Sequence, residues 1–221
     1  MTLEFDHLFI CCDTGAPDVD TILSCGFTEG SSNRHPGQGT TNRRLFFPNA
    51  MLEFLWIENT EEVQQPEIRP TRLWERSRHR ETGYSPFGVS LRPRGQSISI
   101  PFTTVAYAPP YLPASLQIDI AASTHPAEPL IFVIPFGKRP DQLMGDRQQP
   151  LEHACGCREI TQVHIDIVQQ APLSDAATTL DTEGIVHVHP ASEPLATVAF
   201  DHGRQGRSLD CRPQLPLRLQ W

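Results

Sequence analysis

Residues 33–57, NRHPGQGTTNRRLFFPNAMLEFLWI, form the stretch from which the fold is predicted. Two apolar runs, 43–48 and 50–57, lie on either side of Asn49, and two runs joined by a tight turn are typical of a β-hairpin. The loop before them, 33–42, lacks the Gly-Lys-Ser/Thr ending of a phosphate-binding loop and leads into a strand, not a helix. Its glycines and proline are therefore expected to shape a turn.

The sequence upstream of this hairpin predicts a strand followed by a helix. Residues 4–12, EFDHLFICC, are apolar on both faces of an extended chain. In the segment that follows, Pro17 lies near the first turn of a helix, and Gly26 can end it. With a short strand expected near 27–29, residues 1–57 predict one βαβββ module.

Downstream, residues 58–82 are expected to hold one short helix around 71–80, TRLWERSRHR. Beyond it, up to residue 157, lie several strand candidates and proline-containing loops, with no helix expected between these strands. From residue 158 the first pattern recurs. The segments 37–56, GQGTTNRRLFFPNAMLEFLW, and 203–221, GRQGRSLDCRPQLPLRLQW, share a Gly-Gln loop, a strand, a turn with proline and a strand that ends in Trp. We therefore predict a strand-rich middle segment and, over 158–221, a second, degenerate βαβββ-like module.

Composition restricts the class of protein. The net charge of −8, from 18 basic and 26 acidic residues, argues against a general binder of nucleic acids or acidic membranes. The sequence has no run of about 18 apolar residues, and its N-terminal segment has an acid where a signal peptide has Lys or Arg. Six cysteines without a metal-binding spacing are typical of a reducing compartment. We expect a cytoplasmic protein with a small-molecule ligand, and a homodimer remains open.

Two polar side chains interrupt the apolar strands. Glu53 shares a strand face with Met51 and Leu55, and His7 lies between two phenylalanines. Burial of an unpaired carboxylate costs several kcal/mol, so Glu53 needs a cation or hydrogen bonds. An imidazole and a carboxylate on neighbouring strands suit Zn²⁺, Fe²⁺, Mn²⁺ or Ni²⁺.

A βαβββ unit that opens on DHLFI (6–10), contains RHPGQGTTNRRLFF (34–47) and ends on MLEFLWIE (51–58) resembles glyoxalase-like proteins of the vicinal oxygen chelate superfamily. The resemblance implies an α+β fold in which βαβββ modules pair into a curved, incomplete β-barrel around a cavity. It implies a small-molecule enzyme of lyase, isomerase or dioxygenase type. It also implies a divalent metal held by His7 and Glu53, with Glu53 as general base when displaced. The alternative is a metal-free protein that binds or sequesters a small molecule.

A second pair of metal ligands depends on which segment pairs with the first module. With residues 159–221 as the partner, the matching positions are Val163 and Arg218. With residues 85–136 as the partner, the matching positions are Gly88 or Val89, and Ile131 or Phe132. Neither alignment supplies another ligand pair, and a catalytic zinc site usually has three protein ligands.

Two interpretations of Glu53 therefore remain open. In the first, Arg218 neutralises Glu53 directly, and a buried ion pair replaces the metal. In the second, a metal is held by a rearranged ligand set. The histidines that could complete such a set are His35, His164, His187 and His189.

The loop and hairpin also supply donors for a substrate. The candidates for holding a carboxylate or carbonyl group are Arg34, His35, Asn42, Arg43 and Arg218. Because Arg43 and Arg44 alternate across a strand, at most one of them is expected to face a cavity. Tyr111, in a proline-rich loop, is the candidate for the rim of an apolar pocket.

Overall fold

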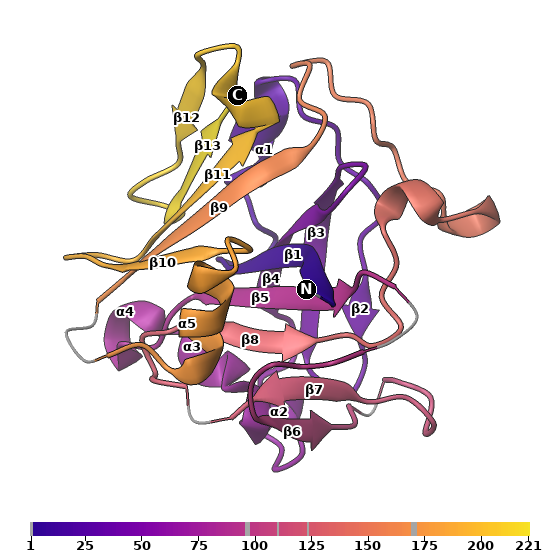
Figure 1. The fold of residues 1–221 in the computed structure, drawn as a ribbon, viewed down its shortest axis with the longest axis vertical. Helices are drawn as coiled ribbons and strands as arrows, with labels where there is room; N and C mark the ends of the chain where they lie inside the picture. Colours follow the sequence, from indigo (N-terminus) through magenta and orange to yellow (C-terminus); the bar gives the residue numbers. More distant parts are fainter. Residues whose placement is uncertain (1, 96–97, 110, 123, 169–171) are drawn as a thin grey trace.

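The computed structural model describes residues 2–95, 98–109, 111–122, 124–168 and 172–221. Over these residues, strands form two sheets with short helices around them, which confirms the predicted α+β class (Figure 1). The strands of the larger sheet are β1 (Leu3–Cys11), β2 (Arg34–His35), β3 (Thr40–Phe46), β4 (Met51–Ile57), β5 (Phe87–Pro93), β6 (Thr104–Tyr107), β7 (Ile118–Ala121) and β8 (Leu130–Val133).

The larger sheet consists of two halves that meet at β1 and β5. Its strand order is β2-β3-β4-β1-β5-β8-β7-β6. Strand β1 is parallel to β4, β5 is parallel to β8, and β1 and β5 are antiparallel, so the order is mirrored about the junction. The strands that continue the sheet of the first module therefore come from 87–133. Within the described residues the sheet is open at β2 and β6, which is the predicted incomplete barrel.

The smaller sheet comes from the C-terminal part of the chain. Its elements are β9 (Ile160–Ile167), α5 (Asp175–Thr182), β10 (His187–Pro190), β11 (Leu195–Phe200), β12 (Ser208–Asp210) and β13 (Leu217–Gln220). The strand order β10-β9-β11-β13-β12 differs from that of the first module, although β12 and β13 pair antiparallel as β3 and β4 do. The division of the chain at 57 and 157 stays a prediction.

The α-helices are short, and local sequence explains where two of them begin or end. Helix α1 (Val19–Ser24) lies in the predicted position and is followed by Gly26 at φ +95°, where a Cβ would lie 2.8 Å from the backbone nitrogen of Cys155. Asn59 caps α2 (Thr60–Val63) through its side-chain oxygen. Helices α3 (Leu73–Ser77) and α4 (His79–Thr82) follow α2 along the chain. No helix among the described residues is long and apolar enough to cross a membrane.

Two details of the first module differ from the prediction. The short strand expected near 27–29 is absent, and β2 lies at Arg34–His35 instead, because it pairs with the start of β3. The register of β1 against β5 also shifts between Phe5 and His7. This bulge at Asp6 turns Phe5 toward the core between the sheets, whereas Phe9 packs on the opposite face, so the two phenylalanines do not flank His7 on one face.

Each face of the larger sheet covers a separate hydrophobic cluster. On one face, alternate residues such as Leu8 and Leu52 pack against the smaller sheet, including Ile165. Between the sheets, the Asn49 side chain donates to the Ile160 carbonyl at 2.7 Å and accepts from the Ile160 N–H at 3.1 Å. The opposite, curved face forms a second cluster that α2 and α3 border. The first cluster is the core, and the second borders a cavity.

A buried histidine in the core makes the fold sensitive to acid. The Thr28 N–H donates to His153 Nδ1 at 2.9 Å, so His153 Nε2 carries the proton and donates to the Phe46 carbonyl at 3.0 Å. Burial lowers the pKa of His153, although the bond to Phe46 opposes the shift. Below a pH of about 6.5 the unfolded chain therefore binds more protons than the folded chain, and stability falls.

We predict that His153→Gln lowers the free energy of unfolding by about 1–3 kcal/mol at pH 7, because a buried hydrogen bond is lost. The variant should also lose less stability than the wild type between pH 7 and pH 5. Urea unfolding at both pH values measures this. The exposed His189→Gln variant is the control and keeps the wild-type decline, and an unchanged decline in His153→Gln contradicts the assignment.

Candidate active site

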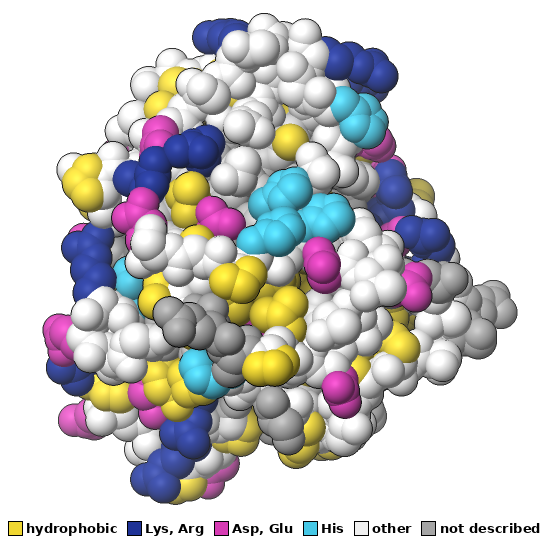
Figure 2. Space-filling model, turned by 60° about the vertical axis from the view of Figure 1, so that its left-hand side comes forward, with side chains coloured by type: hydrophobic (Ala, Val, Ile, Leu, Met, Phe, Trp, Pro, Cys, Tyr) yellow, Lys and Arg dark blue, Asp and Glu magenta, His cyan; other side chains and the backbone are white. Residues whose placement is uncertain are grey.

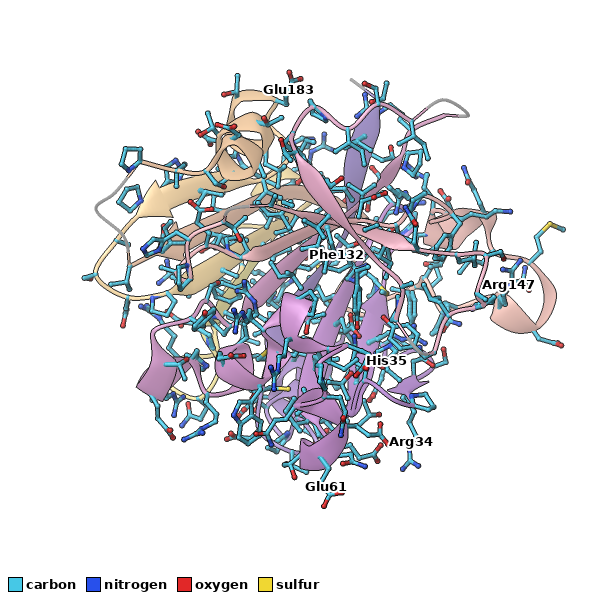
Figure 3. The ribbon with its side chains drawn as sticks, turned by 90° about the horizontal axis from the view of Figure 1, so that it is seen from below. Arg34, His35, Glu61, Phe132, Arg147 and Glu183 are labelled. Carbon is cyan, nitrogen blue, oxygen red and sulfur yellow. The ribbon has the colours of Figure 1, made fainter. Side chains whose placement is uncertain are left out.

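A cavity of about 430 Å³ lies on the curved face of the larger sheet. This volume is in the usual range for small-molecule sites. In Figure 3, Phe132 and His35 lie toward the middle of the molecule, whereas Arg34 extends at its edge. The apolar part of the cavity wall consists mainly of Leu55, Leu73, Leu112, Ile118, Ile120, Leu130, Phe132 and Ile134.

His7 and Glu53, the two predicted catalytic residues, face each other in this cavity. The His7 Nε2 and Glu53 Oε2 atoms are 3.4 Å apart, and both side chains are more than nine-tenths buried. The Nδ1 atom of His7 lies 2.6 Å from Asp6 Oδ1. Because an ionised carboxylate only accepts hydrogen bonds, His7 donates its Nδ1 proton to Asp6 and directs Nε2 at Glu53. The structure thus brings together the pair that sequence reasoning singled out.

Asp6 is held in its charged form by an arginine from the second half of the sheet. Burial opposes ionisation of Asp6, but the hydrogen bond and charge of His7 and the charge of Arg92 keep its pKa below the usual value. The Arg92 guanidinium donates to Asp6 Oδ2 at 3.0 Å and to Glu4 Oε1 at 2.8 Å. It also donates to the Asn49 carbonyl at 2.6 Å. Arg92 therefore neutralises Asp6 and anchors the base of the site.

Glu53 is oriented by a side chain of β3. The Asn42 Nδ2 atom donates to Glu53 Oε1 at 2.5 Å, and Asn42 Oδ1 accepts from the Asn33 N–H at 2.7 Å. Asn42 lines the cavity and its amide donates to Glu53, and its predicted binding of substrate stays a prediction. Arg44 is in register with Glu53 and lines the cavity. Burial lowers the pKa of Arg44, and the charge of Glu53 opposes this.

His35 and Tyr111 lie together at the cavity, as predicted. Their ring centroids are 5.0 Å apart, and His35 Nδ1 is 2.9 Å from Thr40 Oγ1. The Gln38 amide donates to the Tyr111 hydroxyl at 3.4 Å. Burial lowers the pKa of His35 and raises that of Tyr111. Both side chains are therefore neutral near pH 7 and offer the cavity a polar wall without charge.

Two predicted arginines of the first module, Arg34 and Arg43, pair with acidic side chains. Arg34 is at the cavity mouth, mostly exposed, and pairs with Glu58 at 2.8 Å. Arg43 is on the other face of β3 and pairs with Glu29 at 2.6 Å and Asp20 at 2.9 Å, so its prediction as a substrate ligand is wrong. Strand alternation gives the cavity-facing position to Arg44.

Arg218 is not a partner of Glu53. It lies on β13 of the smaller sheet and pairs with Asp210 at 2.9 Å on an exposed face. The predicted Arg218–Glu53 ion pair is therefore wrong, because the segment 158–221 forms a sheet of its own. His164, His187 and His189 are also in the smaller sheet, in contact with one another and not with Glu53.

The ligand set for a metal in the cavity is incomplete. In the first half of the sheet, Glu53 pairs with Phe9, two positions after His7. In the second half, Phe132 pairs with Ser90, two positions after Gly88. The second half of the sheet thus places Gly88 and Phe132 where the first half has its His and Glu. Two protein ligands do not make the three-ligand site that catalytic zinc usually has. His35 lines the same cavity, but no three His, Cys, Asp or Glu side chains among the described residues are grouped so that they could hold a metal ion, so the residues present do not fit a metal centre here.

Sequence reasoning missed the residues that hold the His7–Glu53 pair. Asp6 precedes His7 directly, but strand alternation assigns neighbours to opposite faces, and only the bulge brings their side chains together. Arg92 is 86 positions away from Asp6 in sequence, so its contact depends on the pairing of β1 with β5. The basic residue within strand segment 85–93 was the available signal, because a buried arginine needs an acidic partner.

The curved open sheet and its cavity define a protein of vicinal oxygen chelate type, and proteins of this fold bind small-molecule ligands. A family profile described as glyoxalase-like domain matches residues 5–181. Because this match covers most of the chain, the protein belongs to the glyoxalase-like domain family. The predicted membership of the vicinal oxygen chelate superfamily is confirmed.

Comparisons with whole proteins give less detail. No curated protein matches the chain. A hypothetical protein from Staphylococcus aureus has a similar crystal structure, with a TM-score of 0.57 and 10% identity, over 99% of each chain. A triple mutant of 4-hydroxymandelate synthase from Streptomyces coelicolor matches with a TM-score of 0.45 and 11% identity, over 90% of this chain and 70% of that chain. The first similarity supports the fold alone.

The two arginines allow a test of which one neutralises the site. We predict that Arg92→Met lowers the free energy of unfolding by about 3–5 kcal/mol, because it leaves the Asp6 charge buried without its cation. Arg218→Ala should cost less than about 1 kcal/mol, as exposed ion pairs do. Urea unfolding at pH 7 measures both. Equal costs for the two variants contradict this assignment of the buried charge.

Proposed function

We propose that this protein is a small-molecule enzyme of glyoxalase-like type in which His7 and Glu53 move a proton to and from the substrate. The observation that supports this is the buried 3.4 Å contact between His7 Nε2 and Glu53 Oε2 in a cavity with mostly apolar walls. A carboxylate and an imidazole in such surroundings are suited to general acid–base catalysis.

The hydrogen bonds around the pair give each group its role. Asp6 accepts the His7 Nδ1 proton, which leaves His7 Nε2 facing Glu53 Oε2 at 3.4 Å. Asn42 donates to the other oxygen of Glu53 and fixes the plane of the carboxylate. In the proposed reaction, Glu53 removes a proton from a substrate carbon. His7, still bonded to Asp6, returns a proton from Nε2 to the face of the substrate from which Glu53 removed one.

The cavity also indicates the class of substrate. Arg44 is in register with Glu53 on the neighbouring strand and lines the cavity. Its Nε and one Nη donate to Ser31, and its remaining N–H groups can bind a carboxylate or stabilise a developing oxyanion. The opposite wall, which includes Leu130 and Phe132, can cover an apolar body. We propose a compound with an apolar side chain and adjacent oxygens, whose deprotonation beside a carbonyl gives an enolate anion. Lyase and isomerase reactions both begin with such a step.

Relatives in the superfamily often use a divalent metal, which would act as a Lewis acid on the substrate oxygens. Here the donor set stops at His7 and Glu53, so the proposed proton transfer is assigned to these side chains alone. Among the described arginines that line the cavity, Arg34 pairs with Glu58, whereas Arg44 has its hydrogen bonds to the neutral Ser31 and keeps its charge for an anion in the cavity.

The role of Glu53 can be tested by hydrogen exchange in D₂O. The probes are 2-oxo acids with an apolar side chain, which carry an acidic C–H next to the ketone. We expect the wild type to accelerate deuterium incorporation, followed by proton NMR. Glu53→Gln should reduce the enzymatic rate by about 10²–10⁴-fold, the usual contribution of a general base.

Glu58→Gln is the matched control, because Glu58 lies five residues further along the chain, outside the cavity and paired with Arg34. It should exchange at the wild-type rate. The base assignment is wrong if Glu53→Gln keeps that rate, and the enzyme proposal fails if the wild type accelerates exchange in none of these acids.

Arg44 and Arg43 provide a second test, because they are neighbours on opposite faces of β3. Arg44→Met should weaken binding of the same 2-oxo acids by about 10- to 100-fold, since a charged hydrogen bond contributes about 1.5–3 kcal/mol. Arg43→Met should leave the affinity unchanged, because Arg43 binds Glu29. Calorimetric titration measures both, and the reverse pattern contradicts the orientation of the strand.

A metal-free binding or sequestering protein is the second candidate function. The apolar wall of the cavity and the neutral Tyr111 and His35 at its edge favour it, because an apolar ligand needs no reacting group. Tight binding with equal affinity in wild type and Glu53→Gln, without exchange in either, supports this candidate. The cytoplasmic location and the homodimer stay predictions.

A further inference from the structure

Three histidines form a compact group on the outer surface of the smaller sheet, away from the cavity. Figure 2 shows a group of histidine side chains on one face of the molecule, with acidic side chains nearby. His187 and His189 alternate on β10, and His164 is the residue of β9 in register with His187. The ring centroids are 4.8 Å apart for His164 and His187, 5.8 Å for His164 and His189, and 6.2 Å for His187 and His189.

The backbone places these rings on one face for a simple reason. In both strands the alternate residues, such as Ile165 and Val188, are buried in the core on the other face, which α5 covers. A His-x-His pair on one strand and a directly opposite histidine on the next therefore point the same way. None of this depends on a loop, so the three side chains start from fixed positions.

Two acidic residues complete the arrangement. His187 Nδ1 is 3.0 Å from Asp181 Oδ1, so the ring donates to a carboxylate and leaves Nε2 free to bind. This carboxylate–histidine contact is the usual outer support of a metal-binding histidine. Asp166 is in register with His189 on the same two strands. The rings of His164 and His189 have no hydrogen bond to any described residue, so two further imidazoles are available as ligands.

The spacing of the rings is that of a metal site. With zinc–nitrogen bonds of about 2.0–2.1 Å, three imidazoles around a tetrahedral ion have their ring centroids about 5 Å apart. The observed separations lie near this value. The rings are stacked at present, and no three His, Cys, Asp or Glu side chains among the described residues surround a common point. Ligation therefore needs the imidazoles to turn about a soft side-chain torsion while their centroids move little.

We propose that His164, His187 and His189 bind one Zn²⁺ ion at the surface of the smaller sheet, with Asp181 as the support of His187. Three imidazole ligands suit zinc and leave a fourth position for water or Asp166. The rings bind the ion through neutral nitrogens. Asp166 and Asp181 add negative charge that favours a cation.

Zinc titration of the full chain without a histidine tag tests this, in competition with a chromophoric zinc chelator at pH 7.5. We expect one zinc equivalent per chain. His164→Gln and His189→Gln should each weaken binding at least tenfold, and Asp181→Asn should weaken it by about 10- to 100-fold. With Co²⁺ in place of zinc, the wild type should show the strong visible absorption of a tetrahedral ion, and the histidine variants should lose it.

Two controls separate this site from other positions. His202→Asn changes a histidine outside the group, so zinc affinity should not change. Asparagine tolerates the left-handed backbone at this position. Glu53→Gln should also leave it unchanged. Loss of zinc binding in Glu53→Gln, or wild-type affinity in His164→Gln, overturns the proposal. The circular dichroism of each metal-free variant must match the wild type, because these side chains are on the surface.

Discussion

The buried charge of Asp6 is the constraint on which the candidate site depends. A carboxylate in the middle of a sheet is tolerated only with a cation and hydrogen bonds, and here Arg92 and His7 supply them. Arg92 belongs to β5, so the charge is neutralised only when β1 pairs with β5. The junction of the two halves and the orientation of His7 are therefore set by the same contact.

This junction gives the cavity two unlike walls. The first half contributes Glu53, Asn42 and Arg44 from β3 and β4, and the second half contributes Phe132 and its apolar neighbours from β7 and β8. A pair of similar halves would offer two equivalent ligand sets. Because only one half has the polar set, the proposed substrate would place its reacting group at the wall of β3 and β4 and its apolar body at the wall of β7 and β8.

The sequence was sufficient for the local structure but not for the distant contacts. Alternation in 50–57 placed Glu53 and Leu52 on opposite faces of the strand. The turns at Gly26 and Asn49 followed from residue type, so the hairpin and α1 could be predicted. The choice between Arg43 and Arg44 depended on strand parity, which a one-residue error reverses.

Contacts between segments far apart in sequence were beyond such reasoning. The sequence similarity between 37–56 and 203–221 suggested that Arg218 lies near Glu53. However, similar hairpins do not have to pack against each other, and β13 pairs with β11 in a separate sheet. The bulge at Asp6 is a further case, because it depends on the partner strand and not on the composition of β1.

The chain uses one motif, an aspartate that accepts a histidine Nδ1 proton, in two environments. Asp6 holds His7 in a buried cavity, where Nε2 faces the Glu53 carboxylate and where no third His, Cys, Asp or Glu side chain among the described residues completes a metal-binding group. Asp181 holds His187 at the surface, where two more imidazoles are at metal-site spacing and where water can complete the coordination. The number of further nitrogen donors within reach, more than the motif itself, distinguishes proton transfer from metal binding. On this argument, the proposed role of the first histidine is in proton transfer and that of the second is in metal binding.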